Sequence, residues 1–245
     1  ITRLRDGRWQ IDATGPNINL QAVGVGEDRA VLAVGIREGP GGTSAEAYSF
    51  DSVLGWQSLQ FRSERATLFD LDVRRIGNWA GVGQVTSDGG QEEGYFFHTI
   101  ECPSDQDTVE CPVITRFGGG DDRRALKAID RRPDGETWSV GLGGMLFHRD
   151  GRDTTTQIGD VAQVVAPQGT SIDLYGVAAT SDAEMWAVGS GGYVVHEIAT
   201  LGQLGRVSGI THTLRDIIVL DDGTMWAVGD SGTILYYGPV STISL

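Results

Sequence analysis

The sequence predicts an all-β fold, a five-bladed β-propeller with four antiparallel strands per blade that takes up residues 1–245 as one domain. Two observations predict this fold. A phrase of β-branched residues, tryptophan and glycine recurs along the chain, most clearly as M-W-A-V-G, in units of 40 to 58 residues, and four short strands fill a unit of that length. No segment keeps a 3.6-residue apolar period, so we expect few helices.

Each repeat unit begins at a leucine and follows the same order of short runs. A β-branched run is followed by a turn such as R-P-D-G-E and by a second run that ends in glycine. A glycine-rich connection, a third run such as G-M-L-F-H and a weaker fourth run such as C-P-V-I-T-R-F complete the unit. One such sheet cannot bury both of its faces, so the units are expected to stack on one another. They start near Leu20, Leu68, Leu126, Leu174 and Leu214.

The two ends of the chain are expected to share a blade. The last unit has no fourth run after Tyr237, whereas residues 3–11 read R-L-R-D-G-R-W-Q-I and precede the first unit. We therefore expect residues 1–12 to supply a strand that completes the last blade and closes the ring, because closure leaves no end blade exposed.

The tryptophan and histidine of the repeat are predicted to be packing residues. The tryptophan of W-A-V-G is expected to fill the wedge between neighbouring blades, at Trp79, Trp138, Trp186 and Trp226, with Leu32 in its place in the first unit. Zinc holds its nitrogen ligands at about 2.0–2.1 Å, whereas stacked sheets lie about 10 Å apart. No metal site is therefore predicted at the histidines that recur in the third run, His98, His148 and His196.

The repeat also resembles a known family. The string L-x-x-I…W-A-V-G-x-x-G-x-I-L is similar to repeats of the photosystem II assembly/stability factor family, which is related to Asp-box (BNR, sialidase-like) propellers, and R-D-G-R-W at 5–9 resembles a decayed Asp box. The resemblance implies a propeller. Those factors are seven-bladed, whereas five repeats are found here, so it does not imply a photosynthetic role. The arginine triad, acidic residues and tyrosine of sialidases have no matching positions.

Composition limits the partners. The net charge is −14 and the pI is near 4.6, which argues against binding to nucleic acid or to anionic membranes, since both need clustered cations. The sequence has no run of 18 apolar residues that would predict membrane insertion. We expect a protein or glycan ligand and a monomeric protein.

The two cysteines indicate a compartment. Cys102 and Cys111 bound a polar segment, E-C-P-S-D-Q-D-T-V-E-C, and we expect them to form a disulfide, with two reduced thiols as the alternative. A disulfide in such a loop is typical of an oxidising environment. The chain has eighteen arginines and one lysine, a bias typical of GC-rich bacterial genomes. The sequence thus predicts a secreted or periplasmic bacterial protein.

The position directly after each repeat leucine is a candidate ligand-binding position. In a propeller, the residues just inside the innermost strand face the axial mouth. Two cations, two aromatic rings and an amide at this position would make a binding ring, although surface variation explains the same residues. The five residues are Gln21, Phe69, Lys127, Tyr175 and Arg215.

Long polar connections are a second candidate, since binding residues concentrate in loops on a rigid scaffold. The connection between the second and third runs is enlarged in the first unit, G-I-R-E-G-P-G-G-T-S-A-E-A, and in the second, G-Q-V-T-S-D-G-G-Q-E-E-G. Glu38, Asp88 and Glu92 in these segments would bind a basic partner or a calcium ion; otherwise they are solvated loops. No other cofactor is expected.

A glycoside hydrolase is the enzymatic alternative. Asp70 and Asp216 occupy the same position, two after the leucine, in two different units. Glycosidases hold two carboxyl groups about 5–5.5 Å apart when they retain configuration and about 6.5–9.5 Å apart when they invert it. The other interpretation is that each aspartate binds nearby backbone. On balance the sequence favours a non-catalytic recognition scaffold that binds a protein or carbohydrate through one propeller face.

Overall fold

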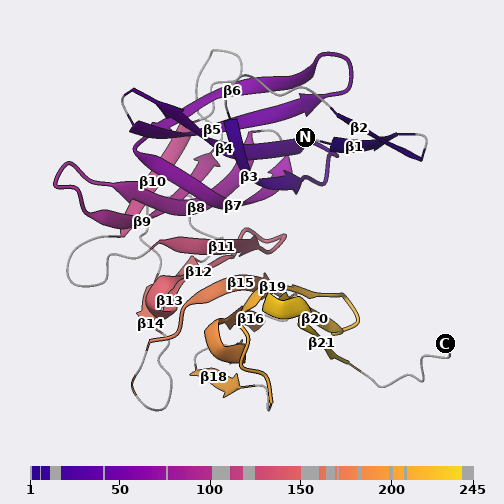
Figure 1. Cartoon of the computed structure of the whole chain (residues 1–245), viewed down its shortest axis with the longest axis vertical. Coiled ribbons are helices and arrows are strands. Elements are labelled where there is room, and N and C mark those ends of the chain that lie inside the picture. The colour runs from indigo at the N-terminus through magenta and orange to yellow at the C-terminus, as the bar shows by residue number, and fades with distance from the viewer. Residues whose placement is uncertain are drawn as a thin grey trace. The chain divides into compact units, whose positions relative to one another are not determined.

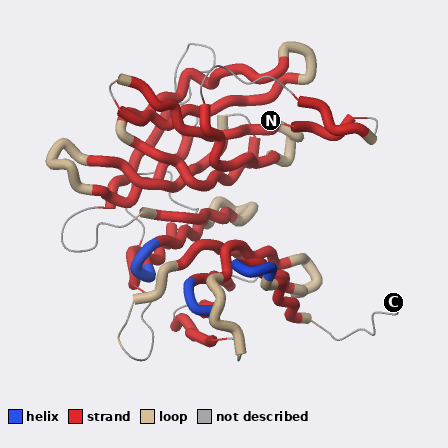
Figure 2. The backbone as a smooth tube through the Cα atoms, in the orientation of Figure 1, coloured by secondary structure: helices blue, strands red, loops and turns tan. Residues whose placement is uncertain are grey.

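The computed structural model describes residues 2–5, 7–11, 18–40, 42–75, 77–100, 111–117, 125–149, 160–163, 169, 171–180, 184–198, 201–206 and 209–238. The chain divides into two compact units, Ile1–Arg123 and Arg124–Leu245. The described residues are almost entirely β-strand, with three one-turn 3-10 helices in the second unit (Figures 1 and 2). The prediction of an all-β fold with few helices is therefore confirmed.

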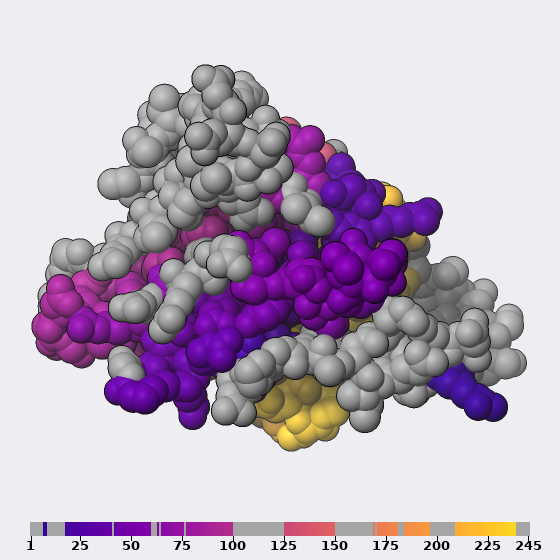
Figure 3. Space-filling view, turned by 90° about the horizontal axis from the view of Figure 1, so that it is seen from above, coloured from indigo at the N-terminus to yellow at the C-terminus, as the bar shows by residue number. Residues whose placement is uncertain are grey.

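The first unit contains two four-stranded antiparallel sheets and a short hairpin. In one sheet the strands follow the order β3 (Ile18–Val25), β4 (Val31–Gly39), β5 (Gly42–Asp51) and β6 (Gly55–Glu64). In the other they follow the order β7 (Ala66–Arg75), β8 (Asn78–Thr86), β9 (Glu92–Ile100) and β10 (Cys111–Phe117). In the space-filling view the described residues of this unit are coloured from indigo through purple to magenta (Figure 3).

The second unit contains three sheets with shorter strands. The first holds β11 (Leu126–Arg131), β12 (Thr137–Gly141), β13 (Met145–Arg149) and β14 (Asp160–Gln163). The second holds β15 (Leu174–Ala179), β16 (Glu184–Gly189), β17 (Tyr193–Ile198) and β18 (Leu201–Arg206). The third has three described strands, β19 (Leu214–Val219), β20 (Met225–Gly229) and β21 (Ile234–Tyr237). Each of the five sheets thus begins with the strand that carries a repeat leucine.

One local device recurs in all five sheets and explains the repeated leucine and glycine. Each leucine pairs with a glycine of the second strand, and a bulge follows the leucine directly, so that the ladder skips the next residue. A side chain on that glycine would clash: a Cβ on Gly83 would lie 1.8 Å from the Thr67 carbonyl oxygen, and one on Gly229 2.4 Å from that of Thr213. Bulges redirect side chains, so this one sets which residues the first strand displays.

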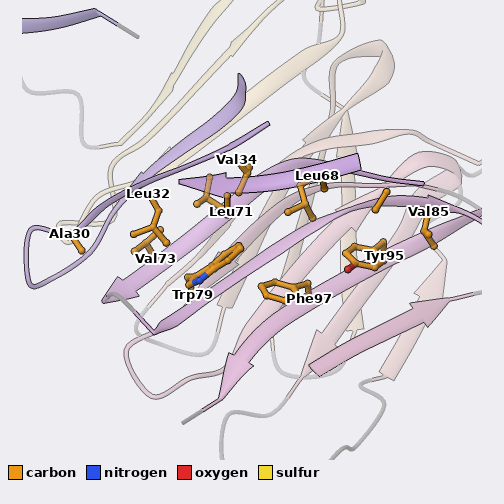
Figure 4. Close-up of a cluster of buried hydrophobic side chains, with 13 residues drawn as sticks. Ala30, Leu32, Val34, Leu68, Leu71, Val73, Trp79, Val85, Tyr95 and Phe97 are labelled. Atoms are coloured by element: carbon orange, nitrogen blue, oxygen red, sulfur yellow. The ribbon is translucent and has the colours of Figure 1, made fainter. Parts of the chain in front are cut away.

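The core of the first unit lies between its two sheets. Leu32 and Val34 of β4 point towards Leu68, Leu71 and the ring of the buried Trp79 (Figure 4). The Trp79 ring also packs against Phe97, with ring centroids 4.6 Å apart. These residues fill the wedge between two sheets, which is the role that the sequence predicted for the tryptophan and for Leu32.

The predicted equivalence of Trp79 with the other tryptophans is wrong. Trp138 pairs with the fourth residue after its leucine, Asp130, whereas Trp79 pairs with the fifth, Val73. The segment N-W-A-G-V-G has one residue more between tryptophan and the pairing glycine, and a shift of one residue turns a side chain to the other face of a strand. Trp79 therefore points back to the β3–β6 sheet, whereas Trp138 and Trp186 point forward to the sheet that comes after them in the chain.

In the second unit each sheet packs on the next. Trp138, Val140 and Leu146 of the first sheet form a cluster with Leu174 and Val177 of the second. Ala178, Val188 and partly buried Trp186 of the second sheet form another with Leu214 and Ile217 of the third. Face-to-face stacking of successive antiparallel sheets is the packing expected of neighbouring blades.

Two enlarged connections are strands rather than loops, which corrects the sequence prediction. β4 and β5 pair from Val31 to Gly39, so that the predicted loop is mostly a regular hairpin. β8 and β9 likewise continue their ladder as far as Thr86 and Glu92. The polar residues that suggested loops alternate along strand faces, a pattern that also suits an exposed hairpin.

The N-terminal segment differs in part from the expectation. Residues 3–11 were expected to form one strand, but β1 (Thr2–Arg5) and β2 (Arg8–Ile11) pair with each other across a turn at Gly7, whose φ is 72°. Closure of the ring by residues 1–12 stays a prediction. The predicted Cys102–Cys111 disulfide lies outside the described residues, apart from the backbone of Cys111 in β10. The helices of the described chain are too short to span a membrane.

Candidate functional site

The bulge residue of each sheet is the position that the sequence selected for ligand binding, and we call it the bulge slot: Gln21, Phe69, Lys127, Tyr175 and Arg215. Arg215 of the third sheet in the second unit lies over the ring of Tyr175 in the preceding sheet, with its Cζ 4.7 Å from the ring centroid. Contact of this kind between a guanidinium and an aromatic face is a cation–π interaction. Two bulge slots of neighbouring sheets thus meet.

Arg215 is held by a carboxylate on its own sheet. Its Nε donates to Oδ1 of Asp230 and its Nη2 to Oδ2, both at 2.9 Å. Asp230 opens the helical turn η3 (Asp230–Gly232), and its backbone N–H donates to the Thr213 carbonyl at 2.8 Å. The turn after the pairing glycine therefore places Asp230 directly beside the bulge slot.

Asp173, one residue before the repeat leucine of its sheet, completes the site. Its Oδ1 accepts a hydrogen bond of 2.7 Å from the backbone N–H of Gly143 in η1 (Leu142–Gly144), on the preceding sheet. Asp173 therefore ties the turn η1 of one sheet to the residue before the first strand of the next. We call Asp173, Tyr175, Arg215 and Asp230 the Tyr–Arg site.

The charges of the Tyr–Arg site are stable near neutral pH. The hydrogen bond from Arg215 lowers the pKa of Asp230, and the same bond raises the pKa of Arg215. Burial, and then the charge of Asp173, raises the pKa of Tyr175. The site thus presents a neutral phenol, a guanidinium and two carboxyl groups, with the side chains of Arg215 and Asp230 about half exposed.

The remaining bulge slots occupy equivalent positions on other sheets. Lys127 is half-buried on β11 in the second unit. Gln21 on β3 is exposed and Phe69 on β7 is half-buried, both in the first unit. The strand registers place all five residues at equivalent bulges, and Tyr175 contacts Arg215. Ligand binding at these positions stays a prediction.

The acidic candidates of the first unit lie on its two hairpins. Glu38 on β4 is opposite Thr43, and Glu92 on β9 accepts a hydrogen bond of 3.2 Å from the Gln84 amide. Asp88 in the turn between β8 and β9 forms a 2.5 Å ion pair with Arg65. Among the described residues, no three histidine, cysteine, aspartate or glutamate side chains converge as metal ligands.

The two aspartates of the enzymatic alternative have a backbone role. Oδ1 of Asp70 accepts from the N–H of Leu71, and Oδ1 of Asp216 accepts from the N–H of Ile217, each at 2.8 Å. Asp130 binds the N–H of Arg131 in the same way at 2.9 Å. Asp70 belongs to the first unit and Asp216 to the second. An aspartate near the bulge thus binds the backbone of the next residue in the chain.

Two of the repeated histidines stack on tryptophan, whereas the ring of His98 lies 5.5 Å from that of Phe96 between centroids. The ring of His148 stacks on Trp138 at 3.9 Å between centroids, and that of His196 stacks on Trp186 at 3.7 Å. Nε2 of each stacked histidine lies within hydrogen-bonding distance of a glutamate two residues before the tryptophan, 2.7 Å from Glu136 and 2.9 Å from Glu184. Each histidine thus contacts residues of its own sheet.

Sequence reasoning did not find Asp173 and Asp230. Both lie next to repeat positions, Asp173 before Leu174 and Asp230 after Gly229. The bulge brings these flanking positions beside the slot, and the register of the leucine with the glycine is the signal that would have revealed them.

Comparisons with known proteins support the fold class. No family model matches the sequence, and no curated protein matches it. Solved β-propeller structures are similar, among them YCF48 bound to D1 peptide, at a TM-score of 0.55 and 13% identity over 94% of this chain and 68% of that one. A streptogramin B lyase has a TM-score of 0.60 and 12% identity over 94% and 72% of the two chains. An inactive virginiamycin B lyase from Staphylococcus aureus with quinupristin has 0.58 and 11%, over 94% and 73%.

Proposed function

We propose that this protein is a non-catalytic recognition scaffold that binds a segment of another protein through the Tyr–Arg site. One observation carries the proposal: two neighbouring bulge slots present an arginine and a tyrosine that are already in contact, with Arg215 held by Asp230 and with Asp173 near enough to Tyr175 for its charge to add to burial in raising the pKa of the phenol. Tyrosine and arginine are enriched among the residues that dominate binding energy at protein interfaces. Side chains that are fixed before binding lose less conformational entropy when a ligand arrives.

The charges of the site and the chain favour a basic ligand. The Tyr–Arg site has two carboxyl groups and one guanidinium, and the chain as a whole carries −14. A negative field accelerates the encounter with a cationic partner. The ligand is therefore a protein segment with lysine or arginine side chains, one of which reaches the carboxyl groups of Asp173 and Asp230.

Two other proposals are less well supported. A glycan would stack on an aromatic ring, but Arg215 already lies over the ring of Tyr175. A glycosidase would need the carboxyl groups of Asp70 and Asp216, and both bind backbone N–H groups. YCF48, whose structure contains D1 peptide, is an example of a similar propeller fold that binds a protein segment. The expected Cys102–Cys111 disulfide supports a secreted or periplasmic location, and we propose that the protein acts as a monomer.

The test is selection of peptides from a random display library on the immobilised full chain, with a glycan array in parallel. We expect selected peptides to be rich in lysine and arginine and to lose at least tenfold in affinity with Tyr175→Ala and with Arg215→Ala. Asp221→Asn is the matched control, because Asp221 is exposed at the opposite end of the same sheet. Glycan binding without peptide binding would replace the protein ligand by a carbohydrate, and binding unchanged in both variants would refute the site.

A further inference from the structure

His212 lies beside the Tyr–Arg site, two residues before the leucine that begins β19. Its Nδ1 lies 3.2 Å from Oγ1 of Thr233, and that hydroxyl donates to the backbone carbonyl of Asp230 at 2.8 Å. The carbonyl of the next residue, Thr213, accepts the hydrogen bond from the N–H of Asp230 at 2.8 Å. Backbone and side chain therefore both hold His212 next to Asp230.

The hydroxyl of Thr233 determines which nitrogen of the imidazole carries the proton. A hydroxyl has one proton to donate, and that of Thr233 goes to the Asp230 carbonyl. Towards Nδ1 of His212 the hydroxyl therefore accepts, so Nδ1–H donates and Nε2 has the lone pair. Because His212 is exposed, a second proton can bind Nε2 without any change in these contacts. Protonation thus creates a positive charge in place.

The charged groups near His212 belong to the Tyr–Arg site. Asp230 opens η3 and binds Arg215 of β19. The turn η2 (Ser190–Gly192) packs on the segment before β19, since a Cβ on its last glycine would lie 2.7 Å from the Ile210 carbonyl oxygen, and this turn contains only serine and glycine. The hydrogen bond from Arg215 lowers the pKa of Asp230, and the charge of His212 lowers it further. The imidazole and this carboxylate are therefore electrostatically coupled.

Arg215, Asp230 and Tyr175 keep their protonation states in the pH range where histidine titrates. Histidine ordinarily changes charge between about pH 5 and 8. The hydrogen bond between Arg215 and Asp230 raises the pKa of the arginine and lowers that of the aspartate. Burial raises the pKa of Tyr175. His212 therefore changes charge beside a guanidinium, a carboxylate and a phenol that do not.

We propose that His212 makes the Tyr–Arg site pH-dependent: a basic protein segment binds while the imidazole is neutral and is released when the imidazole is protonated. This inference rests on the proposed function, in which a lysine or arginine of the ligand reaches Asp173 and Asp230. A neutral imidazole leaves the carboxylate of Asp230 to that cation. A cationic imidazole repels the ligand's cation and offsets part of the attraction of the carboxylate.

The experiment measures the affinity of the full chain for a selected peptide at about pH 7.5 and about pH 5.5. The peptide has blocked ends and contains lysine or arginine but no histidine, aspartate or glutamate. We expect the affinity of the unchanged chain to fall by about threefold to tenfold at the lower pH. His212→Gln should keep the higher affinity at both pH values, and His212→Lys the lower one. His148→Gln is the matched control and should keep the pH response, because His148 stacks on Trp138 in another sheet.

The outcomes separate this inference from the proposed function. An affinity that does not fall at the lower pH, or that falls equally in His212→Gln, would overturn the inference while peptide binding at the higher pH upholds the proposed function. Absence of peptide binding at both pH values would refute the two together. A second measurement needs no ligand and follows the titration of the Asp230 carboxyl by NMR. We expect the pKa of Asp230 to be higher in His212→Gln than in the unchanged chain, and equal values would refute the coupling of the two groups.

Discussion

The two units share the leucine bulge and differ in the connection that comes directly after its pairing glycine. In the first unit the second and third strands run on past Gly35 and Gly83 as hairpins, up to Gly39 and Thr86. In the second unit the chain turns at once through a 3-10 helix, as it does after Gly229. This short turn places Asp230 beside Arg215.

The difference shows which positions of the repeat the two units share and which positions vary. The leucine pairs with its glycine and is followed by a bulge in both units, whereas the residues after the pairing glycine differ from sheet to sheet. In the first unit the backbone of Arg65 joins the hairpins, since its N–H donates to Thr43 at 2.8 Å and its carbonyl accepts from Thr86 at 2.9 Å. Connections after the glycine thus build extended hairpins in one unit and a compact polar site in the other.

The largest effect is expected from a substitution that disrupts the packing of the first unit. Trp79→Ala removes a fully buried ring, which points to the preceding sheet whereas Trp138 points to the following one. We expect the free energy of unfolding to fall by about 3–5 kcal/mol. Chemical denaturation followed by circular dichroism measures it. Val53→Ala, at an exposed turn of the same unit, is the control and should change stability by less than about 0.5 kcal/mol.

The second prediction tests the feature that both units share. Gly83→Ala and Gly229→Ala each place a Cβ within 2.4 Å of a backbone oxygen, so the leucine bulge must shift in either unit. We expect each substitution to destabilise the chain by about 1–3 kcal/mol, measured by denaturant titration. Gly39→Ala has no atom nearer than 3.9 Å to the new Cβ and should leave stability nearly unchanged. Equal stability of all three variants would show that the bulge does not require glycine.

The sequence sufficed for the parts of the fold that repeat. Five leucines located the first strand of five sheets, and the predicted fourth run C-P-V-I-T-R-F became β10. It failed where one residue changed the register, as at Trp79, because strand faces alternate and composition does not reveal the shift. It also failed at the hairpins, because exposed strands and polar loops have similar compositions.

The candidate site could be predicted only in part for a related reason. The bulge slot was recognisable by its place after the leucine, so Tyr175 and Arg215 were identified. Asp173 and Asp230 were not, because their proximity depends on the pairing of Leu174 and Leu214 with glycines that are distant in sequence. Residues that a bulge and a turn bring together have no fixed spacing in the sequence by which they could be recognised.

The smallest effect is expected at the turn after Gly229, where Asp230 pairs with Arg215. The hydrogen bond from Arg215 lowers the pKa of Asp230 below its ordinary 3.8, so the folded state favours the ionised carboxyl. A lowered folded pKa contributes stability that is present above pH 3.8 and is lost as the pH falls through the folded value. Asp230→Asn should therefore lower the melting temperature slightly at about pH 6 and make no difference near pH 2. Thermal melts across this pH range measure the effect, with Asp221→Asn as the control; a deficit that persists at the acidic end would mean that the turn, rather than the charge of Asp230, supplies the stability.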